Sequence, residues 1–100
     1  MIRHKYNAKP TVVNESWFGS KKEARYYSEL LLRVKAGEVL FFLRQVPFHL
    51  PGNTKYVVDF QEFWTDGTVH FIDAKGVLTP AFIRNKKQVE ALYPIEIEVV

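Results

Sequence analysis

Cysteine is absent from the sequence, which excludes disulfide bonds, thiolate metal sites and cysteine nucleophiles. Histidine is scarce, and the wide spacing of His4, His49 and His70 disfavours a structural zinc site. No apolar run approaches the roughly 20 residues that span a bilayer, and the first residues lack the apolar stretch of a signal peptide. We therefore expect a soluble protein of the cytoplasm, or of the host cytoplasm if the source is viral.

Apolar and aromatic side chains, by contrast, are plentiful. Of the 100 residues, 47% are hydrophobic and 15% aromatic, and the net charge is only +3, a composition that excludes disorder. No internal repeat, low-complexity tract or linker divides the chain. Residues 1–100 are therefore predicted to form one domain.

Positive charge is concentrated in the first half of the chain. Residues 1–50 hold nine Lys and Arg against four acids, whereas residues 51–100 hold five against seven. This asymmetry indicates a polyanionic partner such as nucleic acid, and a merely solvated basic surface explains it equally well. The candidate phosphate contacts lie in a basic arm over residues 1–19, in the helix that follows and on one face of a later helix: Arg3, Lys5, Lys9, Lys21, Lys22, Arg25, Arg84 and Lys87.

Sequence patterns predict two helices and four strands. A capping-box pattern from Ser20 predicts a helix over 21–36, and Pro80 begins a second helix that ends near residue 93. Pro47 favours an edge position or a bulge for the first strand. The strands are predicted over 39–50, 56–64, 68–75 and 95–99. The order αβββαβ indicates an α/β fold: an antiparallel meander and a right-handed crossover to a parallel strand, in one mixed sheet flanked by helices.

Two acids interrupt the apolar strands. Asp59 lies within an apolar run, where a carboxylate is costly unless it is paired, protonated or bound to a cation. Asp73 and Lys75, which close the next strand, project from the same face because they are two residues apart. A two-residue hairpin turn at Asp66-Gly67 opposes residue 73 to about residue 60. A slip or bulge of one residue would set Asp59 beside Asp73.

Paired carboxylates repel each other unless a divalent cation lies between them. Mg²⁺ suits such a site because it prefers hard oxygen ligands and keeps several waters. Lys75 beside the ion would orient or deprotonate a water and stabilise charge on an attacked phosphate. Glu23 borders the helix face that packs on the sheet and is a third candidate ligand, and Gln45 on the first strand is a candidate supporting residue.

Each of these residues also has a purely structural interpretation. Glu23 has the spacing of a capping-box partner for the N-cap serine. In the same view Asp73 and Lys75 form a strand-end ion pair, Asp59 accepts a bond from a backbone amide, and Gln45 faces solvent. The basic helix face is then a solvated surface. The residues taken singly leave these alternatives open.

The order of the residues resembles the PD-(D/E)xK nuclease superfamily. A helix glutamate (Glu23), a strand aspartate (Asp59) and an Asp-x-Lys that ends the next strand (Asp73 and Lys75) match its pattern over roughly residues 18–100. The segment from Ser20 to Tyr27 is similar to the opening helix of small phage nucleases and, more distantly, of archaeal-type Holliday junction resolvases. The chain departs from the pattern in having no proline before either aspartate, and aspartate where the resolvases more usually have glutamate.

The resemblance implies a restriction-endonuclease-like fold and a metal-dependent DNA endonuclease. The catalytic residues would be Glu23, Asp59, Asp73 and Lys75, and Mg²⁺ or Mn²⁺ would be held by Asp59, Asp73, the backbone carbonyl of Ala74 and Glu23. The expected reaction is phosphodiester hydrolysis that leaves a 5′-phosphate. Branched DNA, in particular a Holliday junction, is the expected substrate, and a homodimer is the expected active form because paired cuts need two sites.

Three other functions compete with this one. A nuclease of the same fold would act on other DNA ends or flaps. A non-catalytic basic module would hold nucleic acid with aromatic and cationic side chains alone, and a structural subunit would keep the fold without activity. The acids separate these classes, because a pure binder has no reason to gather three carboxylates against a polyanionic ligand.

Overall fold

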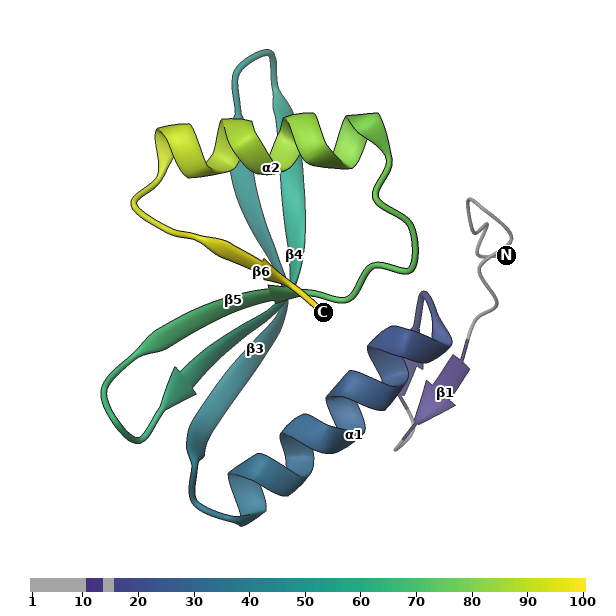
Figure 1. Ribbon diagram of the computed structural model, residues 1–100, viewed down its shortest axis with the longest axis vertical. Helices are drawn as coiled ribbons and strands as arrows, with labels where there is room; N and C mark the ends of the chain where they lie inside the picture. Colours follow the sequence, from purple (N-terminus) through teal and green to yellow (C-terminus); the bar gives the residue numbers. More distant parts are fainter. Residues whose placement is uncertain (1–10, 14–15) are drawn as a thin grey trace.

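The computed structural model describes residues 11–13 and 16–100. In that part of the chain two helices pack on a four-stranded sheet, and a short two-stranded sheet precedes the first helix (Figure 1). In chain order the elements are β1 (Thr11–Val13), β2 (Ser16–Phe18), α1 (Lys21–Lys35), β3 (Val39–Leu50), β4 (Thr54–Trp64), β5 (Val69–Asp73), α2 (Pro80–Leu92) and β6 (Ile97–Val99).

The four-stranded sheet is mixed and has the strand order β3-β4-β5-β6. β3, β4 and β5 are antiparallel neighbours, and the crossover through α2 brings β6 parallel to β5. The α/β class and the αβββαβ order are thereby confirmed for the part of the chain that begins with α1. β3 is an edge strand, as Pro47 within it favours.

Both helices begin where their capping residues predict. The Ser20 hydroxyl accepts a hydrogen bond from the Glu23 amide at 3.1 Å, and the Thr79 hydroxyl accepts one from the Phe82 amide at 3.1 Å. α1 ends in a Schellman motif in which Gly37 adopts a φ of 81°. Each helix ends one residue before its expected end. Neither of these described helices is long and apolar enough to cross a membrane.

Four residues, 65–68, separate β4 from β5, but the Trp64 amide donates a hydrogen bond of 2.9 Å to the Thr68 carbonyl. The loop itself therefore has three residues, 65–67, rather than the expected two. Its glycine adopts a φ of 90°, the left-handed conformation that three-residue hairpin loops commonly require. The extra loop residue shifts the strand register by one, so that Phe60 pairs with Ile72. The next residues along the two strands, Asp59 and Asp73, consequently lie side by side.

The predicted arm over residues 1–19 is wrong for part of that range. β1 and β2 pair as an antiparallel hairpin in which Thr11 lies opposite Phe18, and Phe18 is buried against α1. Strands of three residues are too short to show a clear alternation in the sequence, so packing on α1 decides their conformation. Three of the candidate DNA contacts lie outside the described residues: Arg3, Lys5 and Lys9.

Four strand ends, in three of the strands, also differ from the prediction. β4 begins at Thr54, two residues early, and β6 begins at Ile97, two residues late, because the chain first turns after α2. β5 spans residues 69–73 instead of 68–75. It ends at Asp73 because the following amide, that of Ala74, donates its hydrogen bond to the side chain of Asp59.

Two separate apolar clusters hold the helices on the sheet. α1 packs on a cluster that contains Leu30 and Phe60, and α2 packs on a second cluster that contains Val58 and Val89. The long β3–β4 hairpin runs from beside α1 to behind α2 and contributes to both clusters (Figure 1). Asp59 lies between Val58 and Phe60 in the sequence and therefore at the boundary between the clusters.

Candidate functional site

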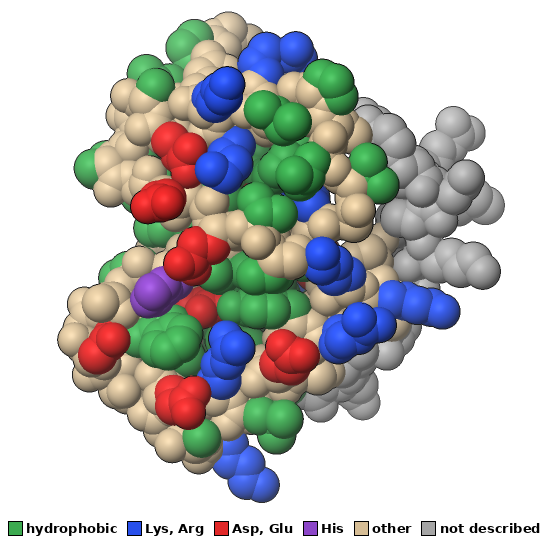
Figure 2. Space-filling model, in the orientation of Figure 1, with side chains coloured by type: hydrophobic (Ala, Val, Ile, Leu, Met, Phe, Trp, Pro, Cys, Tyr) green, Lys and Arg blue, Asp and Glu red, His purple; other side chains and the backbone are tan. Residues whose placement is uncertain are grey.

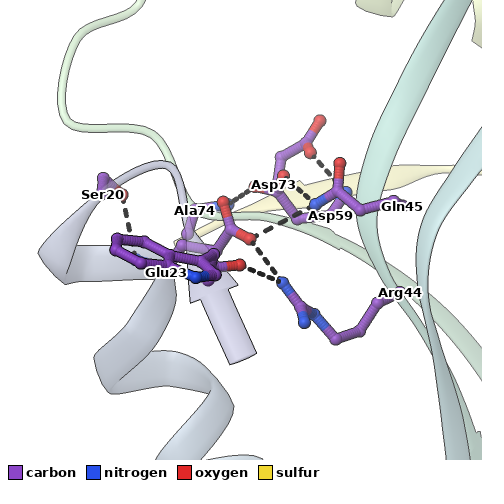
Figure 3. Close-up of polar contacts among 8 residues, drawn as sticks. Ser20, Glu23, Arg44, Gln45, Asp59, Asp73 and Ala74 are labelled. Atoms are coloured by element: carbon purple, nitrogen blue, oxygen red, sulfur yellow. Dashed lines mark hydrogen bonds and ion pairs between the residues drawn. The ribbon is translucent and has the colours of Figure 1, made fainter. Parts of the chain in front are cut away.

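Four polar side chains from four elements approach one another between the start of α1 and the end of β5 (Figure 3). Glu23 comes from the first turn of α1, Gln45 from β3, Asp59 from β4 and Asp73 from the last position of β5. The acids are almost inaccessible to solvent, with exposed fractions of 7% for Glu23, 6% for Asp59 and 0% for Asp73. Burying three carboxylates together is costly, and such costs are concentrated at functional sites.

Asp59 and Asp73 are connected through the backbone. The Asp59 amide donates a hydrogen bond to Asp73 Oδ1 at 3.0 Å, and the Ala74 amide donates one to Asp59 Oδ2 at 2.9 Å. The Tyr56 hydroxyl donates a further bond to Asp73 Oδ2. The interpretation of Asp59 as a buried acid bonded to a backbone amide is thus correct for one oxygen. The other oxygen, Oδ1, faces the amide nitrogen of Gln45 at 3.5 Å.

Glu23 does not complete a capping box. Ser20 caps α1, but the returning bond from the Ser20 amide to the Glu23 carboxylate is not formed in the described structure. The carboxylate instead turns towards the sheet, where its Oε2 lies 3.5 Å from a terminal nitrogen of Arg44 and 3.3 Å from Nε2 of Gln45. The structural interpretation of Glu23 is therefore wrong, and its side chain belongs to the site.

The electrostatics of the site favour neutral or cation-bound carboxyl groups. Burial raises the pKa of Glu23 above its ordinary value, against the opposing charges of Arg44 and Lys75. Burial, reinforced by the charges of Glu23 and Asp73, raises the pKa of Asp59 to about 7. The bond from a backbone amide and the charge of Lys75 only partly oppose this rise. Negative charge in this place is unfavourable unless a cation compensates it.

Gln45 is turned towards the acids. The residue as a whole is exposed to solvent. Its side-chain nitrogen Nε2 nevertheless donates long hydrogen bonds to Glu23 Oε2 at 3.3 Å and to Asp59 Oδ1 at 3.5 Å. The interpretation in which its side chain simply faces solvent is wrong. Figure 3 shows the Gln45 amide joined by dashed lines to the carboxylates of Glu23 and Asp59.

Arg44 is a site residue that the sequence reasoning missed. A terminal nitrogen lies 3.5 Å from Glu23 Oε2 and donates a bond of 3.2 Å to the Trp17 carbonyl. The guanidinium carbon lies 3.9 Å from the ring centre of Phe18, so the charge is stacked on an aromatic face. The signal was the interruption of the inward-facing, otherwise apolar side of β3 by an arginine. Its Nε is buried without a hydrogen-bond partner within the described protein.

Lys75 lies beside the site without pairing with Asp73. Its ammonium nitrogen is 5.4 Å from the ring centre of Phe82 in α2. Both Lys75 and Asp73 are described residues, and no ion pair joins them. The strand-end ion pair is therefore absent, and the positive charge of Lys75 remains within electrostatic reach of Glu23 and Asp59.

The donor chemistry of the site suits a hard divalent cation. Asp59 Oδ1, the Glu23 carboxylate and the Ala74 carbonyl are oxygen donors of the kind that Mg²⁺ prefers. Asp73 accepts two hydrogen bonds, but each carboxylate oxygen keeps a second lone pair. Across residues 11–13 and 16–100, no group of three or more acidic or histidine side chains already has the arrangement of a metal site. The residues fit Mg²⁺ by chemistry, although the Gln45 amide stands between two of the carboxylates.

The first turns of α1 present a basic surface next to the acids. The predicted contacts Lys21, Lys22 and Arg25 are all exposed. The Lys22 ammonium donates a hydrogen bond of 3.0 Å to the Lys75 carbonyl and thereby ties α1 to the segment that follows β5. Figure 2 shows Lys and Arg side chains gathered beside the N-terminal end of α1. The site thus lies next to a surface that suits an anionic ligand.

A second basic surface lies on α2. Arg84 and Lys87 are exposed and line a groove together with Pro80 and Ile83. Lys86, one position away, is instead paired with a glutamate of the same helix at 3.0 Å. The two cations predicted to contact DNA from this helix are therefore available to a ligand.

Comparison with known proteins gives a family but no activity. Residues 3–99 match the family model described as "Protein of unknown function (DUF1064)". The chain belongs to this family. The matched range contains every element that contributes to the site, so the acids lie within the family's domain. No curated protein and no solved structure matches the sequence significantly.

Proposed function

We propose that the protein is a metal-dependent DNA endonuclease with a restriction-endonuclease-like core, related to the PD-(D/E)xK superfamily. The observation that carries this proposal is the burial of Glu23, Asp59 and Asp73 at one place beside an exposed basic surface. Metal-assisted hydrolysis of a phosphodiester requires carboxylates that hold a divalent cation and, next to them, a surface that attracts the polyanionic substrate.

In this proposal Glu23, Asp59, Asp73 and the Ala74 carbonyl hold Mg²⁺ or Mn²⁺. The bound ion supplies Lewis-acid polarisation of the phosphate and lowers the pKa of a water. The chain's own groups set the geometry. Hydrogen bonds from the backbone amides of β4 and of the residue after β5 hold both aspartate side chains in place before substrate arrives. Lys75 orients the attacking water and offsets negative charge on the phosphate. The product is a 5′-phosphate.

The preferred substrate in this proposal is branched DNA, such as a four-way junction. The basic surfaces of α1 and α2 suit phosphate contacts, which position a duplex without reading its sequence. Cutting two strands of a junction needs two sites, so the active form is a homodimer.

The competing binding module is disfavoured by the same acids. A protein that only holds nucleic acid gains nothing from three buried carboxylates, one of which has a pKa raised to about 7. Their cost in stability is offset only if the charges serve a cation or a reaction. An inactive subunit has no need to retain them either.

Incubation of the purified protein with four-way junction, flap, duplex and single-stranded DNA, in Mg²⁺ or in EDTA, tests the proposal. We expect cleavage that requires the metal and is fastest on the junction. Preferred cutting of flaps or ends would retain the nuclease and change its substrate. Tight DNA binding with no cleavage of any substrate in Mg²⁺ or Mn²⁺ would instead support the binding module.

A further inference from the structure

Gln45 has a backbone conformation that is unusual for its position. It adopts a φ of 53° in the middle of β3, although left-handed conformations are uncommon for residues other than glycine. Its neighbours Arg44 and Val46 keep their regular pairing with Phe60 and Val58 of β4. The local strain is therefore confined to Gln45, and strain of this kind persists only where the surroundings enforce it.

The consequence of this conformation is the position of the amide. Residues 41 and 43, four and two positions before Gln45, are exposed on the strand. The Gln45 side chain instead places one nitrogen 3.3 Å from Glu23 and 3.5 Å from Asp59, so it bridges α1 and β4. Both contacts are long, so the amide is held loosely between two acids.

We propose that the Gln45 amide occupies, in the metal-free protein, the place that a divalent cation takes between Glu23 and Asp59, so that amide and cation exclude each other. This inference rests on the metal-dependent function proposed above. An amide N–H carries only a partial positive charge and offsets the repulsion of two buried carboxylates incompletely. A cation with two full charges offsets it far better, and the amide must leave before the cation enters.

The competition makes Gln45 a gate for the metal. The apparent affinity for a cation equals the intrinsic affinity multiplied by the fraction of protein in which the amide has left the site. The more often the amide occupies the site, the weaker the apparent binding. Removing the amide should therefore strengthen metal binding. If Gln45 were instead a metal ligand, its removal would weaken binding, so the sign of the change decides between the two roles.

Calorimetric titration with Mn²⁺ alone tests the gate. Gln45→Gly removes the amide and adopts a positive φ without strain, so the fold is retained. We expect this variant to bind Mn²⁺ about tenfold more tightly than the unmodified protein. Asn53→Gly is the matched control, because Asn53 also has a positive φ, 57°, but lies in the exposed β3–β4 turn. Its Mn²⁺ affinity should be unchanged.

Gln45→Lys gives an independent test that needs no activity. A lysine at this position offers a full positive charge to Glu23 and Asp59. The metal-free variant should melt at a higher temperature than the unmodified protein, and its Mn²⁺ affinity should fall by at least about tenfold. A lysine variant that binds Mn²⁺ normally would overturn the gate.

The remaining outcomes separate this inference from the proposed function. If the unmodified protein binds Mn²⁺, Asp59→Asn abolishes binding, and Gln45→Gly binds equally or more weakly, the gate is overturned and the metal site stands. If the unmodified protein takes up no Mn²⁺ at millimolar concentration and behaves like Asp59→Asn, the metal-dependent function itself is overturned, and the gate with it.

Discussion

The backbone amide of Asp59 donates a hydrogen bond of 3.0 Å to the side chain of Asp73. The side chain of Asp59 in turn accepts a bond from the amide of Ala74, the residue after Asp73. Each strand thus positions the acid of the other, and neither carboxylate can move without disturbing its neighbour. This arrangement fixes two candidate metal ligands in the absence of any ligand.

Asp73→Asn should abolish cleavage and leave DNA binding unchanged or tighter. Asparagine keeps the shape, and its oxygen still accepts the Asp59 amide, while the loss of one charge weakens the metal site and relieves repulsion of phosphate. We expect the cleavage rate on a four-way junction to fall by at least about a hundredfold. Asp66→Asn, at an exposed position in the β4–β5 loop, is the control and should cut normally. Normal cleavage by Asp73→Asn would contradict the assignment.

Glu23→Gln separates the site from the helix cap. Glutamine keeps the reach of the side chain and loses its charge, so α1 should remain folded while cleavage falls by at least about tenfold, roughly 1.4 kcal/mol of barrier. Ser20→Ala removes the actual cap and should cost about 1 kcal/mol of stability while sparing the chemistry. Melting temperature and junction cleavage are measured for both variants. A stable, fully active Glu23→Gln protein would confine the site to Asp59, Asp73 and Lys75.

Asp59→Asn should stabilise the metal-free protein at alkaline pH. Burial raises the pKa of Asp59 to about 7 from the model-compound value of 3.8, so the folded state binds this proton more tightly than the unfolded state. The stability that this group contributes is fully present below about pH 4 and is lost as the pH rises from about 4 to about 7. At pH 8 the variant should gain at least about 1 kcal/mol, a rise of about 4–8 °C in melting temperature.

The pH dependence supplies the check on this prediction. Near pH 4 Asp59 is protonated in the folded protein and resembles asparagine, so the difference between variant and parent should nearly vanish. Melting temperatures at pH 4, 6 and 8 in EDTA measure that difference directly. A variant that is less stable than the parent at pH 8 would show that the Asp59 charge is compensated within the protein.

The exposed cations should determine the salt dependence of DNA binding. Each phosphate contact that is lost should lower the slope of log affinity against log salt by about 0.9 on duplex DNA. Arg84→Gln and Lys87→Gln together should therefore lower the slope, whereas Lys86→Gln, which removes a cation already paired with a glutamate, should not. Replacing Lys21, Lys22 and Arg25 together should have a similar effect.

The basic segment at the start of the chain is tested in the same assay. Arg3, Lys5 and Lys9, replaced together by glutamine, should reduce the salt slope if they contact phosphates. An unchanged slope would exclude these three residues from the binding surface and leave it to α1 and α2.

The sequence predicted the acids of the site because they break a rule that can be recognised locally. Asp59 stands out as a carboxylate in an apolar strand. The position of Asp73 beside it follows from the register of the β4–β5 hairpin. The length of that loop was not predictable, because Asp66-Gly67 suits a two-residue and a three-residue turn alike. The one-residue difference decides whether the two aspartates meet.

Other contacts are determined by tertiary structure, even where the sequence carries a partial signal, as it does at Arg44. Arg44 acquires its role by stacking on Phe18, a residue of the short β1–β2 hairpin that no alternation reveals. The Tyr56 bond to Asp73 exists only because β4 and β5 pair. The positive φ of Gln45 could not be predicted, because glutamine is not a residue type that favours this conformation. Such features arise from the packing of elements and not from their local sequences.

The boundary between the two apolar clusters passes through the site, with Val58 on one side and Phe60 on the other. An ion that joins Glu23 of α1 to the aspartates of β4 and β5 would therefore cross-link α1 to the sheet at the boundary between two parts of the core. Local unfolding of either part would then have to break that link first. The amides of Asp59 and Ala74 should exchange with solvent deuterium more slowly when the ion is bound.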